Sequence, residues 1–483
     1  MNHQASERSQ SRQLALTLLA AAVVVGSGVL LGRVLVTPQW TQAVTVIGLG
    51  ATFLLLLISP PAGLLLWILL APYSHSIYLR VNMGGGIPDL DLTRLTTVFL
   101  AFLLVLQATV RPRVDALAQR RLARPGWPEL AMVAFVITMA LSIPSSSRGI
   151  VANIQAQFDF MLIPLLIYYF ARNLLRSERA LAATIGMLAL AAVLLGAVTV
   201  REQLTGQALF PPFEYPLDYE PHIRKVLSLF GSPTTIVTAL AASLPLLLYG
   251  IRQARTFNRR AGLGVAVIVA LAGLFFAYVR AGWLGAVVGV ILVVALSPGL
   301  RRTFLPLLPV IVLVAVVASA VVAIRPEVVQ QRLTSEQPIT YRLEAWEIAW
   351  NLFQRAPFLG VGFGEFGRRA VMEYGWDPFA VKGIVGSSPA VHNSYLDALI
   401  SGGLLAFIPY LGIFLALFQR GRAYWSRPAN RDLIATLWAT LGGYLLIIGT
   451  YDVLNAQYAN MVFFLIMGTL VGRLEEMNGE VLT

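Results

Sequence analysis

The 483-residue sequence contains no cysteine, few charged residues and only four histidines. The absence of cysteine excludes disulfides, thiolate metal sites and a cysteine nucleophile. Charged residues make up 12% of the chain, whereas soluble globular domains carry roughly 25%. Because 57% of the residues are hydrophobic and the mean hydropathy is +0.73, the composition predicts a polytopic membrane protein.

Apolar runs long enough to cross a bilayer recur along the whole chain. Runs of about 17–25 residues, interpreted as spans, predict about 12–14 transmembrane helices. Their centres lie near residues 23, 50, 66, 102, 136, 166, 190, 242, 270, 289, 313, 406, 441 and 464. The first run is long for a signal peptide and lacks a small-x-small cleavage site, so it is interpreted as a membrane helix. We therefore expect an all-α integral membrane protein whose single polytopic domain spans residues 1–483.

Basic residues mark alternate connections of this predicted bundle. The net charge of +12 comes almost wholly from arginine. The arginine-rich segments that fall on one side are residues 111–124, 172–179, 252–260, 301–302 and 420–431. Because cytoplasmic loops are enriched in arginine and lysine, this side and both termini are predicted to be cytoplasmic. The longer segments 201–233 and 325–391 are then extracytoplasmic loops.

The second of these loops is predicted to contain an amphipathic helix over residues 340–354. Four residues at helical spacing define an apolar stripe: Trp346, Ala349, Trp350 and Phe353. Pro338 precedes the helix and Pro357 follows it. Tryptophans on such a stripe suit the headgroup zone of a membrane, and packing against the helix bundle is equally allowed.

A glycine-rich segment comes after this helix, with Gly360, Gly362 and Gly364 at alternate positions. A dinucleotide-binding fingerprint requires a strand before the glycines, whereas a helix is expected here. The segment also faces away from cytoplasmic nucleotides. We therefore predict a flexible or tightly turning loop, in which backbone N–H groups could approach an anion.

His392 lies where the long loop meets the next apolar span, directly before Asn393 and Ser394. Histidine titrates near neutral pH, so an imidazole at a wet membrane interface can accept and return protons. His392 is therefore a candidate general base, and an interfacial anchor residue is the alternative.

Several basic residues are predicted on the same side as His392. Arg280 lies between two apolar runs with hardly any loop, so it either has a functional role or snorkels to the interface. Arg224 and Lys225 stand just outside a span, and Arg342 falls in the first turn of the amphipathic helix. Guanidinium groups bind phosphate oxygens in bidentate fashion, so converging cations could hold a diphosphate. Together with a base, such cations indicate transfer from a lipid-linked diphosphate donor.

Four motifs follow one another between residues 225 and 403. The first is a basic residue, Arg224 or Lys225, before the turn Leu229-Phe230-Gly231-Ser232-Pro233. The second places Arg280 in a Val-Arg-Ala-Gly-Trp turn. The third is an Arg-x-x-x-Trp helix that leads to spaced glycines, formed by Arg342, Trp346, Pro357, Gly360, Gly362, Gly364 and Phe366. The fourth joins His392 and Asn393 to Gly403. Together the motifs resemble the signatures of the O-antigen ligase and polymerase superfamily of bacterial membrane glycosyltransferases.

The resemblance implies a mostly helical, GT-C-like glycosyltransferase in the bacterial inner membrane with an extracytoplasmic active site. The residues that it assigns to the site are His392 as base, Arg280, Arg342 and Arg224 or Lys225 on the diphosphate, and Asn393, Gly360, Gly362, Gly364 and Gly403 in support. The donor would be an undecaprenyl-diphosphate-linked glycan. The acceptor would be lipid A-core for a ligase, or another lipid-linked repeat unit for a polymerase. No metal ion, cofactor or nucleic acid is expected.

Alternatives of other kinds remain open at this point. The chain departs from the ligase form of the last motif, because Ala406 replaces its final glycine. A polytopic transporter would also be rich in spans, but transporters generally place polar sites near the membrane midplane, whereas the candidate residues here cluster at one face. A non-catalytic partner in an envelope-assembly complex is a third possibility.

Overall fold

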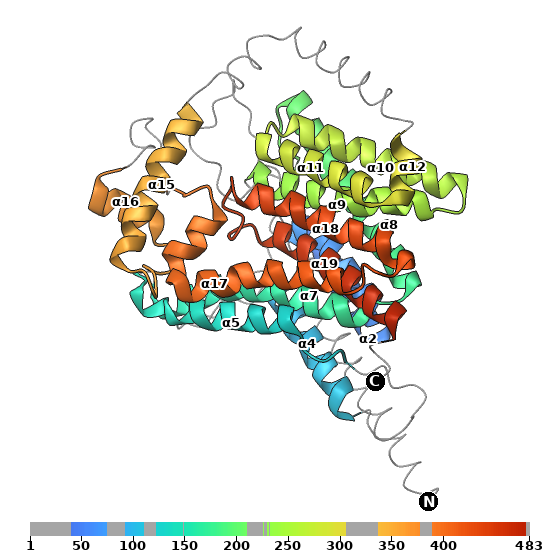
Figure 1. The fold of residues 1–483 in the computed structure, drawn as a ribbon, viewed down its shortest axis with the longest axis horizontal. Helices are drawn as coiled ribbons and strands as arrows, with labels where there is room; N and C mark the ends of the chain where they lie inside the picture. The colour runs from blue at the N-terminus through green and yellow to red at the C-terminus, as the bar shows by residue number, and fades with distance from the viewer. Residues whose placement is uncertain are drawn as a thin grey trace, which may run out of the picture.

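The computed structural model describes residues 40–74, 92–110, 122–147, 149–209, 226, 229–230, 232–305, 337–376 and 389–479. Every regular element in these ranges is a helix, which confirms the expected all-α fold (Figure 1). The helices before the long loop are α2 (Trp40–Ile58), α3 (Pro60–Ser74), α4 (Leu92–Val110), α5 (Trp127–Leu141), α6 (Ile150–Gln157), α7 (Ile163–Leu174), α8 (Glu178–Thr205), α9 (Pro233–Gln253), α10 (Phe257–Phe276), α11 (Arg280–Leu296) and α12 (Pro298–Phe304). The remaining α-helices are α15 (Gln337–Arg355), α16 (Phe366–Tyr374), α17 (Ser394–Ala423), α18 (Arg431–Ile448) and α19 (Gln457–Asn478).

Helices occupy the predicted spans wherever the structure describes the chain. The runs centred near residues 23 and 313 lie outside the described residues. By length and composition, seven of the helical segments could cross a membrane, or eight if α11 and α12, bent by 111°, form one span. The protein is therefore a polytopic membrane protein, and the total of 12–14 spans stays a prediction.

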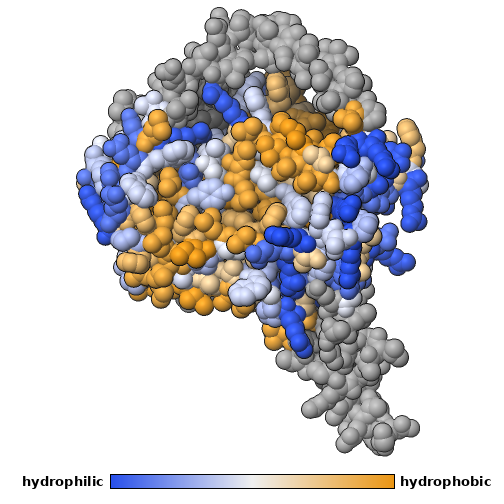
Figure 2. All heavy atoms as spheres, in the orientation of Figure 1, coloured by the Kyte–Doolittle hydropathy of each residue, from blue (hydrophilic) through white to orange (hydrophobic). Residues whose placement is uncertain are grey.

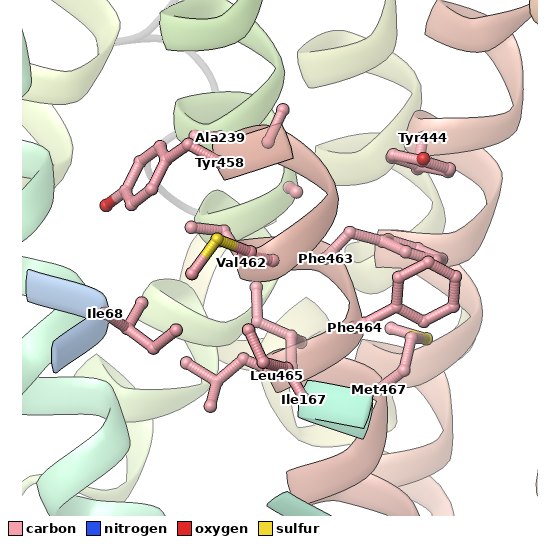
Figure 3. Close-up of a cluster of buried hydrophobic side chains, with 14 of the residues drawn as sticks. Ile68, Ile167, Ala239, Tyr444, Tyr458, Val462, Phe463, Phe464, Leu465 and Met467 are labelled. Carbon is pink, nitrogen blue, oxygen red and sulfur yellow. The ribbon is translucent and has the colours of Figure 1, made fainter. Parts of the chain in front are cut away.

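The centre of the bundle is α19, which packs against α7, α9 and α18. Figure 3 shows its apolar side chains, among them Phe463, which stacks on Tyr444 of α18 with ring centroids 3.7 Å apart. Glycines allow the closest approach: a Cβ on Gly468 or Gly472 would collide with backbone carbonyls of α7. Small residues at helix contacts are typical of membrane bundles, because packing and not water exclusion drives association there.

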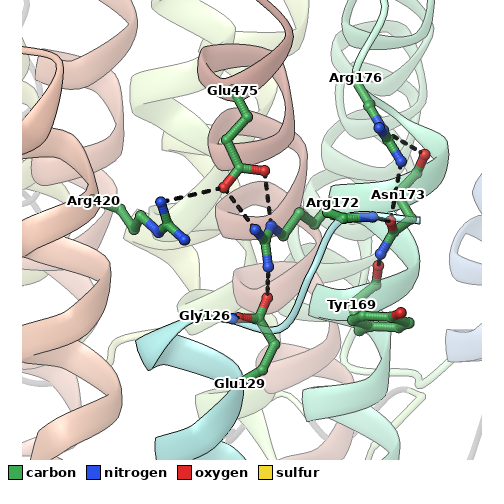
Figure 4. A network of polar contacts seen from close by, with 9 residues as sticks. Gly126, Glu129, Tyr169, Arg172, Asn173, Arg176, Arg420 and Glu475 are labelled. Carbon is green, nitrogen blue, oxygen red and sulfur yellow. Dashed lines mark hydrogen bonds and ion pairs between the residues drawn. The ribbon is translucent and has the colours of Figure 1, made fainter. Parts of the chain in front are cut away.

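A buried ion network ties four helices together at one end of the bundle (Figure 4). Arg172 of α7 donates hydrogen bonds of 2.8 and 2.9 Å to Glu475 of α19 and also pairs with Glu129 of α5. Arg420, near the end of α17, lies 3.8 Å from Glu475. Charges in such a place are tolerated only when paired, so this network holds α5, α7, α17 and α19 in register.

The predicted loop 201–233 begins later than expected. α8 continues to Thr205, and Gly206 ends it in the left-handed conformation, with φ 73°. No helix-breaking residue precedes Gly206, so residues 201–205 extend the helix instead of starting the loop.

The long loop carries a helical cap, defined here as residues 337–376, at the other end of the bundle. Its first helix, α15, confirms the predicted amphipathic helix. Of the predicted apolar stripe, Ala349 is buried and Trp346 and Phe353 pack partly buried against the same cluster, so the prediction is wrong only at Trp350. The buried face is formed by Ala345, Ile348, Ala349 and Leu352, whereas the side chain of Trp350 is 49% exposed. This face packs on α16 and α17. Alanines are buried here because they let the helices approach closely, and the bulkier tryptophan is displaced to the rim.

Candidate active site at the cap end of the bundle

His392 stands immediately before α17 and lies among aromatic rings from two other segments. Its ring centroid is 5.4 Å from that of Tyr341 in α15 and 5.7 Å from that of Tyr451, which follows α18. The backbone of His392 is left-handed, with φ 53°. Left-handed residues other than glycine are uncommon and concentrate where the surrounding structure imposes a functional geometry.

The start of α17 is tied to the loop that carries Tyr451. Asn393 caps α17, because its side-chain oxygen accepts hydrogen bonds from the backbone N–H groups of Tyr395 and Leu396. The hydroxyl of Ser394 donates to the carbonyl of Tyr451 at 2.9 Å and accepts from the N–H of Val453 at 2.8 Å. His392 and Tyr451 are therefore held together by the main chain on either side of them.

Arg342 joins the same cluster from α15. Its guanidinium carbon lies 5.4 Å from the centre of the Tyr451 ring, a cation–π contact. Two neighbours fix α15 beside the chain that leads to His392: Tyr341 exchanges hydrogen bonds with the backbone of Ala390, and the indole of Trp346 donates to the carbonyl of Val391 at 3.0 Å. Arg342 and His392 therefore both contact the ring of Tyr451.

Arg280 begins α11 and is exposed. Packing between α11 and α18 fixes the position of Arg280 along the bundle. A Cβ on Gly285 of α11 would collide with Ile447 of α18, so the two helices are in contact there. Arg280 lies before Gly285 in α11, and Tyr451 follows the end of the antiparallel α18, four residues after Ile447. Arg280 is therefore at the same end of the bundle as Tyr451. Tyr278, two residues earlier, is also left-handed, with φ 53°.

Arg224 and Lys225 lie outside the described residues. The chain just after them is anchored, because Val226 and Leu229 are buried and Phe230 stacks on Tyr458 of α19 with centroids 5.3 Å apart. Leu229 has a φ of 72°. Of the three left-handed residues other than glycine in the described ranges, Leu229 and His392 fall in the first and fourth motifs, and Tyr278 directly precedes the second.

The glycine segment is a tight turn that docks on a break in α17. Gly360, Gly362 and Gly364 have φ values of 68°, 106° and 72°, which only glycine adopts readily. The N–H groups of Val361 and Gly362 donate to the carbonyls of Ile400 and Ser401 at 2.7 and 3.1 Å. These two donors therefore bind α17 and are not presented to an anion.

The break itself is at Gly403, which has a φ of 64° inside α17. A Cβ there would collide with the backbone carbonyl of Phe358. Ala406, the departure from the family motif, is fully buried, and its methyl group occupies the space that a Cβ on Gly402 would need. The third motif, through its glycine segment, and the fourth motif, through Gly403, thus form one backbone joint. Alanine fits at position 406 because residue 402 is glycine.

A buried carboxylate fastens the cap to the turn after α5. Glu365, with its side chain 1% exposed, accepts hydrogen bonds from Ser146, from the side chain and backbone of Ser147, and from Arg368 at 2.7 Å. Burial raises the pKa of Glu365, but these donors outweigh it, so the pKa lies below its ordinary value. The ionised side chain holds the cap on the bundle.

Two acidic residues that the sequence did not suggest, Asp397 and Asp452, lie beside Tyr451. Asp397 of α17, 4% exposed, accepts from Ser401 at 3.1 Å and lies within hydrogen-bonding reach of Asp452. Asn455 donates to Asp452 at 2.9 Å. Burial raises the pKa of Asp452, and these hydrogen bonds oppose the rise only in part. Among the described residues, no three His, Asp or Glu side chains converge to hold a metal ion.

Comparison with known proteins gives a match over the region of the chain that carries most of the predicted motifs. Residues 265–411 match a family model described as O-Antigen ligase. This match supports the resemblance to the O-antigen ligase superfamily that the sequence motifs predict. The matched residues 265–411 include Arg280, Arg342, the glycine segment and His392, while Tyr451 lies beyond them. No curated protein matches the chain. The family supports a membrane glycosyltransferase of the ligase and polymerase type.

Proposed function

We propose that this protein transfers a glycan from an undecaprenyl-diphosphate-linked donor to an acceptor sugar, in the manner of an O-antigen ligase with lipid A-core as acceptor. The observation that carries the proposal is the shared ring of Tyr451. A candidate base, His392, and a cation, Arg342, both contact it. Arg280 begins a helix at the same end of the bundle.

The charges at this end suit an anionic leaving group. Neither Arg280 nor Arg342 pairs with a carboxylate in the described part of the chain. Other arginines are neutralised: Arg94 by Asp159, Arg172 by two glutamates, and Arg252 by Asp432. Unneutralised guanidinium groups can bind phosphate oxygens, and Arg224 or Lys225 would add to them.

The transfer would proceed by direct displacement. The acceptor hydroxyl oxygen forms a bond to the anomeric carbon of the donor glycan, and the bond from that carbon to the diphosphate oxygen breaks. His392 accepts the hydroxyl proton, and Arg280 and Arg342 stabilise the negative charge that develops on the diphosphate as it leaves with the lipid. Both effects act on charge that appears in the transition state, where stabilisation accelerates the reaction.

The surface glycans of cells that lack the gene test this assignment. Loss of all long chains attached to lipid A-core supports the ligase. Attachment of a single repeat unit supports the alternative of the same family, a polymerase that adds lipid-linked repeat units. Purified protein in vesicles, supplied with the lipid-linked donor and the acceptor, should form the transferred product. An unchanged glycan profile together with no product would contradict both assignments.

The side of the membrane is tested separately. We propose that the cap is extracytoplasmic, since the arginine-rich connections lie at the other end of the bundle. A reporter fused at Gly375, at the end of α16, should be extracytoplasmic, and one at Arg427, between α17 and α18, should be cytoplasmic. The same side for both reporters would overturn the topology.

A further inference from the structure

The cap carries an apolar tip at the turn between α15 and the glycine segment. The side chain of Phe358 is 66% exposed and that of Leu359 is 44% exposed. Scattered apolar residues are normal on a protein surface, so these two require a second observation before they indicate a contact.

Backbone hydrogen bonds fix the position of this tip on α17. The N–H of Leu404 donates to the carbonyl of Pro357 at 2.8 Å, and that of Leu405 donates to the carbonyl of Phe358 at 3.3 Å. The tip therefore lies directly beside Leu405, two residues past the break at Gly403.

Leu405 is the first residue of an exposed apolar stripe along α17. The stripe follows helical spacing and consists of Leu405, Ile408, Leu411, Leu415 and Phe418. The neighbouring α5 exposes a similar stripe of Leu130, Val133, Ile137 and Leu141. Figure 2 shows hydrophobic side chains gathered over α5 and α17, with hydrophilic ones at the edge where the cap lies. Apolar stripes exposed on membrane-spanning helices face lipid.

The lengths of the two helices place the edge of the hydrocarbon layer near Gly403. After that residue α17 continues for 20 of its 30 residues, to Ala423, and about 20 helical residues cross the apolar core. Before it, α17 is largely buried in protein. Gly402 packs on Met139, two residues before the end of α5. The lipid-facing parts of α5 and α17 therefore both end at the level of the tip along the bundle axis.

We propose that Phe358 and Leu359 insert into the bilayer leaflet on the cap side, as a continuation of the lipid-facing stripe of α17. The cap is then anchored to the lipid as well as to α17. This anchor sets the depth of α15, which carries Arg342, relative to the membrane that would hold a lipid-linked substrate. The insertion depends only on the protein's place in a membrane and not on the proposed transfer.

The absence of cysteine from the sequence makes a direct test possible. A single spin label on Leu359→Cys, in vesicles of phosphatidylethanolamine and phosphatidylglycerol, reports access to oxygen, which enters lipid, and to a water-soluble nickel complex. We expect oxygen access to dominate, at a depth of about 5–10 Å below the phosphates. Phe358→Cys provides a second label if Leu359→Cys inserts poorly.

Two matched labels calibrate the measurement. Ile408→Cys, on the α17 stripe, should give the lipid pattern, and Met372→Cys, 74% exposed on α16, should give the water pattern. If the label on Phe358 or Leu359 shows the same water pattern as the label on Met372, the proposal is overturned. Dipolar broadening that disappears on dilution with unlabelled protein would overturn it too, because a second copy of the chain would then cover the tip.

Discussion

The rings of His392 and Tyr451 lie edge to face, with centroids 5.7 Å apart and planes at 72°. Arg342 contacts the same phenol ring. Because Tyr451 lies beyond residues 265–411, which match the family model, the C-terminal part of the chain completes the candidate site that those residues begin.

Tyr451 therefore has a positioning role that depends on its ring. Tyr451→Ala should lower transfer by about 2–30-fold, since aromatic and cation–π contacts contribute about 0.5–2 kcal/mol. Tyr451→Phe keeps the ring and should retain most of the activity. Initial rates of transfer by both purified variants provide the measurement, and an equal loss in Tyr451→Phe would instead assign the role to the hydroxyl.

Arg280 is expected to stabilise the leaving diphosphate. Arg280→Ala should reduce transfer by about 10²–10³-fold, the usual effect of removing one group aimed at developing charge. Arg280→Lys should recover part of this, because an ammonium keeps the charge but not the bidentate contact. Arg201→Ala is the control, since Arg201 is an exposed arginine at the same end of the bundle. Full activity in Arg280→Ala would make that residue an interfacial anchor.

Gly403 is expected to be essential for the joint between the cap and α17. Gly403→Ala should destabilise the protein by about 1–3 kcal/mol, because the methyl group meets the carbonyl of Phe358 and the backbone is left-handed. Gly186→Ala is the matched control: it lies in α8 with open space around it, so alanine should be neutral or slightly stabilising. The melting temperatures of both variants are measured in the same detergent. Similar values for Gly403→Ala and Gly186→Ala would contradict the claim that Gly403 is essential for the joint.

Glu365 should make the attachment of the cap sensitive to acid. Its pKa is lower in the folded protein than in the unfolded chain, so its contribution is complete above the ordinary glutamate pKa and is lost as the pH falls through the folded value. Glu365→Gln should lower the free energy of unfolding by about 1–3 kcal/mol at pH 7. The difference from wild type should shrink in acid.

Glu373→Gln is the control for this prediction, because Glu373 forms only partly exposed ion pairs with Arg355 and Arg369. Such pairs contribute about 0–1 kcal/mol. Unfolding measured from pH 7 to pH 3 compares the three proteins. A constant difference between wild type and Glu365→Gln over that range would show that ionisation of Glu365 does not hold the cap.

The sequence predicts the helices well because lipid imposes a simple requirement, a run of apolar residues of sufficient length. It predicts the cap helix for a similar reason, but only part of its buried face. Helical spacing placed Trp350 on the buried face beside Ala349, whereas the structure exposes Trp350 and buries Ala345 instead. The alanines are buried because α16 and α17 approach them, and that approach is a tertiary property.

The candidate site was predictable only where a motif marks it. His392, Arg280 and Arg342 stand in such motifs, and the structure brings His392 and Arg342 together. Tyr451 is one of 16 tyrosines, in a short connection without periodicity, and nothing local distinguishes it. The docking of the glycine segment on Gly403 depends on backbone hydrogen bonds between distant segments, which leave no pattern in the side chains.

The most direct test of the account concerns His392. Its left-handed backbone makes asparagine the appropriate replacement, because asparagine tolerates that conformation and has no group that titrates near neutral pH. Transfer and donor binding are measured separately on folded His392→Asn in vesicles. We expect transfer to fall by about 100-fold or more, the usual contribution of a general base, with donor binding nearly unchanged because the arginines hold the diphosphate. Turnover close to that of wild type in His392→Asn would contradict the central claim.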